Sequence, residues 1–112
     1  NMMGLEAKHL IAGHWVGNTE TFENMPISGV INHFPVGTTQ NVDCATEAAA
    51  PAFECYAQTT TVKRAAFLRK IASQIENRGW EITKIGTRKT GLPAARFDGE
   101  RGRTTGQLAL FA

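Results

Sequence analysis

The chain has 112 residues, of which 42% are hydrophobic and 20% are charged, and its formal net charge is +2. This composition is ordinary for a folded protein and excludes a collagen-like fibre or an intrinsically disordered chain. No apolar run approaches the roughly 20 residues of a membrane-spanning helix, and no apolar secretory segment follows Asn1-Met2-Met3, so we expect a cytoplasmic protein with no membrane partner.

Short apolar runs separated by turn residues occupy the N-terminal third of the chain. His9–Val16 is typical of a small hairpin in which Gly13 takes a positive φ. Thr21–Met25 and Val30–Phe34 follow, and each run stops at a proline. We therefore predict short antiparallel strands within residues 1–37, which need another element to pack on because strands this short are unstable alone.

A helix is predicted to follow, with Thr38 as its N-cap and apolar residues at helical spacing after it. Pro51 lies inside this helix and predicts a kink or break near Ala48, because proline removes one hydrogen bond and crowds the preceding turn. Cys44 and Cys55 are eleven residues apart, about 16 Å along a helix axis. That distance is too long for a disulfide, so we expect two buried or half-exposed thiols in a reducing compartment.

The stretch Thr60–Thr90 has an apolar stripe at helical spacing, which predicts one amphipathic helix or two in line. Gly79 and Gly86 fall on the stripe, and each costs about 1 kcal/mol of helix propensity relative to alanine. Either the helix breaks near Asn77-Arg78-Gly79, or another backbone approaches closely there. Gly91 is the expected left-handed cap. The stripe comprises Leu68, Ile71, Ala72, Ile75, Gly79, Ile82 and Gly86.

A last helix is predicted from Ala94 to Ala112, with three different faces. Gly99, Gly102 and Gly106 share one face, which implies either a close backbone approach or a wall that must stay clear of side chains. The opposite face comprises Phe97, Arg101, Thr104, Leu108 and Phe111. A polar stripe between them comprises Arg96, Glu100, Arg103 and Gln107, and is either a solvated flank or part of a site.

The residues alone contain no complete catalytic constellation. His9, His14 and His33 have no cysteine or carboxylate at ligand spacing, so no metal site is expected. Neither cysteine has an adjacent base, and the glycines do not form a dinucleotide fingerprint. The residues alone therefore predict a helix-dominated α+β protein without catalytic, cofactor-binding or metal-binding residues.

Charge is uneven, because residues 1–60 hold one lysine and six acids, for −5, while residues 61–112 hold eleven lysines and arginines and four acids, for +7. A basic half can indicate nucleic-acid binding. No nucleic-acid motif accompanies this one, so we expect no nucleic-acid partner.

The order of several motifs resembles the opening of the aldehyde dehydrogenase superfamily, and the likeness runs from Leu10 to Ala112. The closing run Phe97–Leu108 is more specific. It resembles the corresponding sequence in the branch that oxidises α-ketoglutaric semialdehyde (2,5-dioxopentanoate) with NAD(P). The other motifs are Leu10–Val16, Pro26–Gly29, Pro35–Thr38, Arg64–Ala72 and Thr90–Pro93.

This resemblance implies a much longer parent, in which the cofactor domain, the catalytic cysteine and the general-base glutamate lie beyond Ala112. Neither Cys44 nor Cys55 matches the catalytic motif. The chain would then be one incomplete domain, with a strand segment at 1–37 and a helical segment at 38–112. It is expected to be inactive alone and to bind no cofactor.

In the family, the helix corresponding to 94–112 borders the substrate entrance. The resemblance implies that, in the full-length parent, Arg103 recognises the distal carboxylate of a semialdehyde, with Arg96 and Gln107 assisting and Glu100 on the same side. A guanidinium suits this role because it can bind a carboxylate in bidentate fashion.

The faces that the parent would cover predict self-association, most simply as a homodimer. Trp15, Phe34, Tyr56 and Trp80 are the candidates for the buried contact. The alternative function is a standalone, self-associating helical binding module with no enzymatic role.

Overall fold

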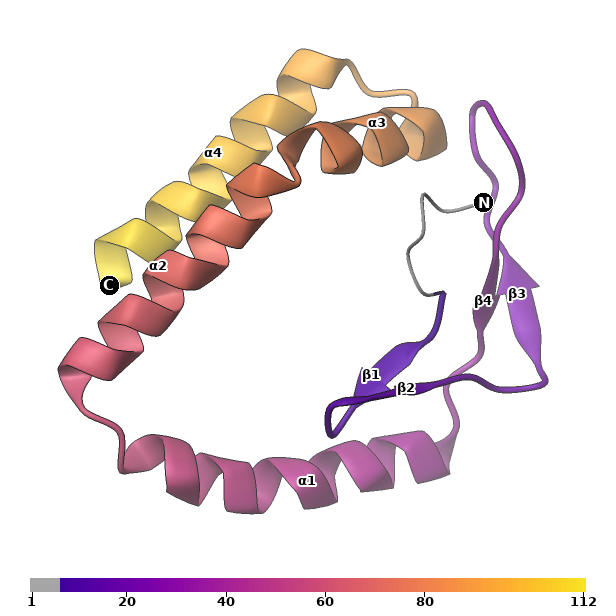
Figure 1. The fold of residues 1–112 in the computed structure, drawn as a ribbon. Coiled ribbons are helices and arrows are strands. Elements are labelled where there is room, and N and C mark those ends of the chain that lie inside the picture. The colour runs from indigo at the N-terminus through magenta and orange to yellow at the C-terminus, as the bar shows by residue number, and fades with distance from the viewer. Residues whose placement is uncertain (1–6) are drawn as a thin grey trace. The chain divides into compact units, whose positions relative to one another are not determined.

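The computed structural model describes residues 7–112, and within them four short strands precede four helices (Figure 1). This is the helix-dominated α+β architecture that the sequence predicts. Contacts divide the chain into two units: the strands with α1, and Pro26–Gly29 with the other three helices. The elements are β1 (His9–Ile11), β2 (His14–Val16), β3 (Thr21–Glu23), β4 (His33–Pro35), α1 (Thr39–Ala57), α2 (Thr61–Asn77), α3 (Gly79–Thr90) and α4 (Ala94–Phe111).

The predicted hairpin is formed by β1 and β2, which pair antiparallel with Leu10 opposite Trp15. Its two turn residues both have positive φ, 52° for Ala12 and 79° for Gly13. A turn of this kind matches the right-handed twist of paired strands. The sequence predicted the positive φ for Gly13 alone, but Ala12 adopts it too, as in the type I′ turn, which requires a positive φ at both central residues.

β3 and β4 also pair antiparallel, with Phe22 opposite Phe34 and their ring centroids 5.8 Å apart. β4 begins later than the predicted strand Val30–Phe34. The difference has a local cause, because the backbone N–H of Asn32 donates to Oδ1 of Asn24 at 2.7 Å. A side-chain acceptor there replaces one bond of a regular ladder.

α1 begins at the predicted cap. Oγ1 of Thr38 accepts from the backbone N of Asn41, and Oδ1 of Asn41 accepts from the backbone N of Thr38, each at 3.0 Å. Nδ2 of Asn18 donates to Oδ1 of Asn41 at 2.9 Å and to the carbonyl of Val36 at 2.6 Å. The side chain of Asn18 therefore ties the loop after β2 to the start of α1.

Pro51 lies inside α1, yet the helix continues through it without interruption. The predicted break near Ala48 is therefore wrong. Pro51 is exposed, so the carbonyl that loses its helical donor can bond water, and the penalty does not end the helix. Cys44 and Cys55 are free thiols on this helix, as predicted, but both are exposed rather than buried or half-exposed.

In the second unit, α2 ends at Asn77 and α3 begins at Gly79, which confirms the predicted break. Oγ1 of Thr60 caps α2 by accepting from the backbone N of Lys63 at 3.1 Å. Gly91 ends α3 with a φ of 75°, the left-handed cap that the sequence predicts.

The loop Pro26–Gly29 packs on the end of α3. The backbone N–H groups of Ile27 and Ser28 donate to the carbonyl of Arg88 at 2.9 and 3.1 Å. A carbonyl in the last turn of a helix has no partner within the helix. The loop therefore supplies the donors that this end of α3 needs.

Large apolar side chains stay accessible throughout residues 7–112, where no hydrophobic side chain is fully buried. Phe53 is 72% exposed and Trp80 is 64% exposed. Isolated exposed apolar residues are normal, but so many of them indicate surfaces that are usually covered by another partner. None of the helices in this described part of the chain combines the length and apolarity needed to cross a bilayer.

Candidate functional site

The polar stripe predicted from the sequence lies on α4, which packs along α2 and α3 (Figure 1). Two of the residues predicted to share a face with Phe97 are accessible, since Thr104 is exposed and Phe111 is 73% exposed. The helix is rotated so that Thr105 packs inward instead. The less accessible positions of the last helical segment are Phe97, Arg101, Thr105, Leu108 and Ala112.

Gly79 and Gly86 of α3 leave room for two side chains of α4. A Cβ on Gly79 would lie 2.6 Å from Cζ of Arg101, and a Cβ on Gly86 would overlap the ring of Phe97. The close approach predicted for these glycines is therefore made, by side chains rather than by a backbone. Both glycines are needed for α4 to lie this near α3.

Arg101 fixes the rotation of α4 by contacting both other helices of its unit. Its Nε donates to Oε2 of Glu76 at 3.2 Å, and its Nη1 donates to the carbonyl of Gly79 at 3.1 Å. Oγ1 of Thr105 donates to the other carboxylate oxygen of Glu76 at 2.9 Å. The Arg101 side chain is only 20% exposed, so these bonds hold α4 in one orientation.

Asp98 completes this network at the start of α4. Its Oδ1 accepts from Oγ1 of Thr83 at 2.8 Å and from Nη1 of Arg101 at 3.1 Å. The hydrogen bond from Thr83 lowers the pKa of Asp98, and Arg101 acts in the same direction, while desolvation acts against them. The carboxylate is therefore held in its charged form.

The predicted site residues lie on the side of α4 that stays accessible. The carboxylate of Glu100 lies 3.4 Å from Nε of Arg96 and 3.8 Å from Nη1 of Arg103. Gln107 follows one turn later on the same face, and its side chain is exposed. The structure thus brings three of the four residues together, with one carboxylate shared by two guanidinium groups. Such a group keeps a net positive charge and can accept a further anion.

Gly99, Gly102 and Gly106 lie on an open face of α4. Within residues 7–112, no atom lies within 4 Å of the place where a Cβ on any of them would stand. The close backbone approach that these glycines suggested is not made by the described chain. They leave a surface without side chains beside the polar stripe.

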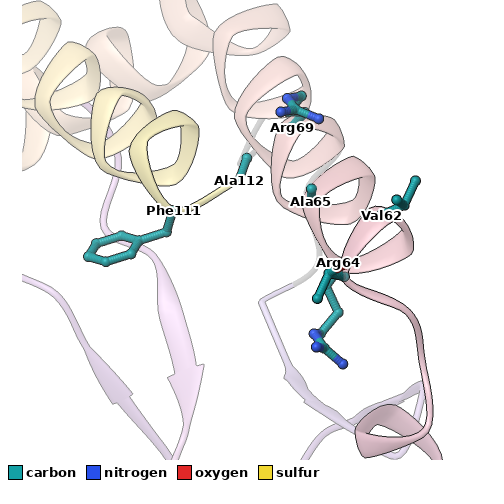
Figure 2. Close-up of a pocket in the computed structure, with 7 residues that line it drawn as sticks. Val62, Arg64, Ala65, Arg69, Phe111 and Ala112 are labelled. Atoms are coloured by element: carbon teal, nitrogen blue, oxygen red, sulfur yellow. The ribbon is translucent and has the colours of Figure 1, made fainter.

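A hollow of about 470 Å³ lies between the end of α4 and the first turns of α2 (Figure 2). Figure 2 shows the Phe111 ring extending from α4 and the Arg64 side chain extending from α2. Nη1 of Arg64 donates to the carbonyl of Thr59 at 2.6 Å. The hollow is lined by Thr61, Val62, Arg64, Ala65, Arg69, Phe111 and Ala112.

On α4 this hollow lies one helical turn beyond the polar stripe, because Phe111 follows Gln107 by four residues. The sequence analysis did not place Arg64 and Arg69 beside the end of α4. They are far from Phe111 in the sequence, and only the packing of α4 on α2 brings them to the same hollow. No signal in the sequence would have identified them. No three His, Cys, Asp or Glu side chains in the described residues are grouped as metal ligands.

Comparisons with known proteins identify the family of this chain. The sequence profile of the aldehyde dehydrogenase family matches residues 15–112. The α-ketoglutaric semialdehyde dehydrogenase of Acinetobacter baylyi is 49% identical over 79 residues, and the α-ketoglutaric semialdehyde dehydrogenase 2 of Azospirillum brasilense is 46% identical over 79 residues. Each match covers 70% of this chain but only 15% of the relative.

A malonate-semialdehyde dehydrogenase of Lacticaseibacillus casei is 34% identical over 100 residues. Among solved structures, an NAD-dependent benzaldehyde dehydrogenase from Corynebacterium glutamicum superposes with a TM-score of 0.84 at 25% identity. That match covers 99% of this chain and 26% of the other. The chain is thus similar in fold to one segment of a much longer protein. With the family profile matching 98 of its 112 residues, the chain belongs to the aldehyde dehydrogenase family.

Proposed function

We propose that this chain is the N-terminal portion of an NAD(P)-dependent aldehyde dehydrogenase that oxidises a carboxylated semialdehyde such as α-ketoglutaric semialdehyde, in the cytoplasm. The 49% identity to the Acinetobacter enzyme carries this proposal. The identity is lower, 27% and 34%, to the malonate-semialdehyde dehydrogenases of Halalkalibacterium halodurans and Lacticaseibacillus casei. The difference favours the longer semialdehyde as substrate.

Arg103 is the residue that we assign to the substrate carboxylate, with Arg96 and Gln107 assisting. Its side chain is 79% exposed, and its only described ion pair is the long one to Glu100. Most of its N–H groups are therefore available to a carboxylate. Glu100 offsets part of the positive charge, which would keep the site from holding the acid product too tightly.

A chimera tests this assignment. Residues 15–112 replace the corresponding segment of the Acinetobacter enzyme, and Arg103→Ala is made in that chimera. We expect kcat/KM for α-ketoglutaric semialdehyde to fall about tenfold or more, because a charge-assisted hydrogen bond contributes about 1.5–3 kcal/mol. The rate with pentanal, which has no carboxylate, should change little.

The matched control is Arg78→Ala, which removes an exposed arginine outside the stripe. An equal loss with pentanal, or no loss with the semialdehyde, would contradict the role of Arg103. An active chimera that prefers pentanal would contradict the proposed substrate class.

We propose that the 112-residue chain is inactive alone, since the resemblance places the nucleophile, its base and the NAD(P) site beyond it. The assay is NAD(P)H formation from the semialdehyde by the purified chain, with and without a chain that supplies the rest of the fold. Activity without that second chain would contradict the proposal. Activity with it would make this chain a subunit.

We also propose that the chain forms a homodimer through its exposed apolar surfaces. Trp15 is 54% exposed and Tyr56 is 45% exposed, in addition to the exposed Trp80. Phe34 is half-buried beside Phe22 and offers less area. Self-association also fits the alternative function, a binding module with no enzymatic role. Light scattering should give twice the chain mass of 12.2 kDa.

A further inference from the structure

Glu76, near the end of α2, binds α4 at two points. Its Oε2 accepts from Nε of Arg101 at 3.2 Å, and its Oε1 accepts from Oγ1 of Thr105 at 2.9 Å. The other acceptors near that hydroxyl are carbonyls of α4 itself, at 3.2 and 3.3 Å, so the Glu76 oxygen is the nearest one. Arg101 and Thr105 are four residues apart, so both bonds lie on the same face of α4, one helical turn apart. A carboxylate that makes both bonds restrains α4 from turning about its own axis.

The sequence of α4 allows a second rotation of this helix. Thr104 has the same hydroxyl as Thr105 and directly precedes it, but it is exposed and its Oγ1 donates to a carbonyl of its own helix at 3.1 Å. Phe97 and Leu108 stay on the packed side whichever threonine points inward, because both threonines project within a quarter turn of them. Apolar packing therefore discriminates weakly between the two rotations, and the bonds to Glu76 select one of them.

The direction of the polar stripe follows this rotation, because α4 is one continuous helix. Arg103 lies two positions after Arg101, about 200° around the helix, and is exposed. Side chains extend about 5–6 Å from a helix axis, so a turn of about 30° displaces their ends by about 3 Å. That displacement is a whole hydrogen-bond length. A small turn of α4 is therefore enough to move the Arg103 guanidinium out of contact with a carboxylate.

The contacts of Glu76 with α4 lie within the second unit, which contains α2, α3 and α4. In residues 7–112, Glu76 binds Arg101 and Thr105 but forms no hydrogen bond or ion pair with the polar stripe. Nη1 of Arg101 also donates to the carbonyl of Gly79 and to Oγ1 of Thr83, at 3.1 and 3.2 Å. Loss of the Glu76 carboxylate should therefore loosen the rotation of α4 without releasing the helix.

We propose that Glu76 is a positioning residue for the substrate carboxylate. By binding Arg101 and Thr105, it selects the rotation of α4 that directs Arg103 and Gln107 toward a carboxylate that Glu76 itself does not touch. The inference rests on the proposed function, because it needs a carboxylated substrate and the role assigned to Arg103. It extends the determinants of substrate choice from α4 to α2.

The chimera that carries residues 15–112 in the Acinetobacter enzyme tests the inference in four forms: unmodified, Glu76→Ala, Arg103→Ala and the double variant. With α-ketoglutaric semialdehyde, Glu76→Ala should raise KM about fivefold and leave kcat nearly unchanged, because the distal carboxylate is bound equally in the ground state and the transition state. With pentanal, neither constant should change by more than about twofold. In the Arg103→Ala background, Glu76→Ala should add less than about twofold to KM for the semialdehyde, because residues that act through one contact are not additive.

Two control substitutions and one milder variant accompany these forms. Gln74→Ala shortens an exposed side chain two residues earlier on α2 and should leave KM unchanged. Thr105→Val removes only the hydroxyl that binds Glu76, and it decides the outcome if the Glu76→Ala chimera does not fold. Thr105→Val should raise KM for the semialdehyde about threefold, whereas Thr104→Val, the same change at the exposed neighbour, should leave it unchanged.

Equal losses with pentanal and the semialdehyde, or an additive effect in the Arg103→Ala background, would overturn the inference and leave Glu76 with a purely structural role. An unchanged KM in both Glu76→Ala and Thr105→Val would overturn it too. In these cases Arg103→Ala still impairs the reaction of the semialdehyde, and the proposed function stands. An Arg103→Ala chimera with unchanged KM and kcat would instead contradict the proposed function, and the inference with it.

Discussion

Nη1 of Arg101 donates to the carbonyl oxygen of Gly79 at 3.1 Å, at the point where α2 gives way to α3. One side chain of α4 thus binds the junction between the other two helices of its unit. The absence of a side chain on Gly79 makes room for it. This relationship sets the direction in which the polar stripe of α4 faces.

Arg101→Ala should lower the free energy of unfolding of the second unit by about 2 kcal/mol, because it leaves Glu76 and the Gly79 carbonyl without a charged donor. Urea unfolding followed by circular dichroism measures the change. Arg103→Ala is the control, since its side chain is 79% exposed and its pair with Glu100 is long. Equal losses in the two variants would show that the network around Arg101 does not hold α4.

Gly86→Ala and Gly102→Ala should change stability in opposite directions. The new Cβ at Gly86 overlaps the Phe97 ring, and overpacking of this kind costs about 1–3 kcal/mol. At Gly102 the described chain leaves open space, so alanine should stabilise α4 by up to about 1 kcal/mol through helix propensity. Thermal melting of both variants is the measurement, and a melting temperature raised by Gly86→Ala would contradict the packing of α3 on α4.

Pro51→Ala should stabilise α1. The structure shows an uninterrupted helix through an exposed proline, so alanine restores one hydrogen-bond donor without disturbing a packed surface. The gain should be about 1–3 kcal/mol. Unfolding of the chain followed at 222 nm would detect it, with Ala50→Gly as a variant of opposite sign. A loss of stability in Pro51→Ala would mean that the proline makes a contact that helix α1 needs.

Asp98 should make the second unit sensitive to acid. Its pKa in the folded chain is below the ordinary value of 3.8, chiefly because Thr83 donates to it. The unfolded state then binds a proton first as the pH falls, so this contribution is complete above 3.8 and is lost as the pH drops through the folded value. Carboxyl titration by NMR measures the shift, and Thr83→Val should return the pKa toward 3.8. A pKa that is unchanged by Thr83→Val would exclude this hydrogen bond as the cause.

Local signals in the sequence determined the limits of most elements and the family. Thr38, Thr60 and Gly91 cap or end helices as predicted, because each acts on backbone groups within a few residues of itself. The break beside Gly79 follows from the same local chemistry. The family motifs are also continuous short runs, so a sequence comparison detects them directly.

Only the tertiary structure decided what those elements contact. Helical periodicity placed Phe97 and Arg101 on one face but could not tell whether Thr104 or Thr105 packs inward with them, because neighbouring positions on a helix differ by only 100° and the choice depends on the partner helix. Likewise, Gly79 and Gly86 were consistent with a close approach by another part of the chain, but the sequence did not identify that part. The structure shows that α4 approaches them, through the side chains of Arg101 and Phe97. Contacts between residues so far apart in the sequence produce no periodic pattern in either helix, so the sequence could not predict them.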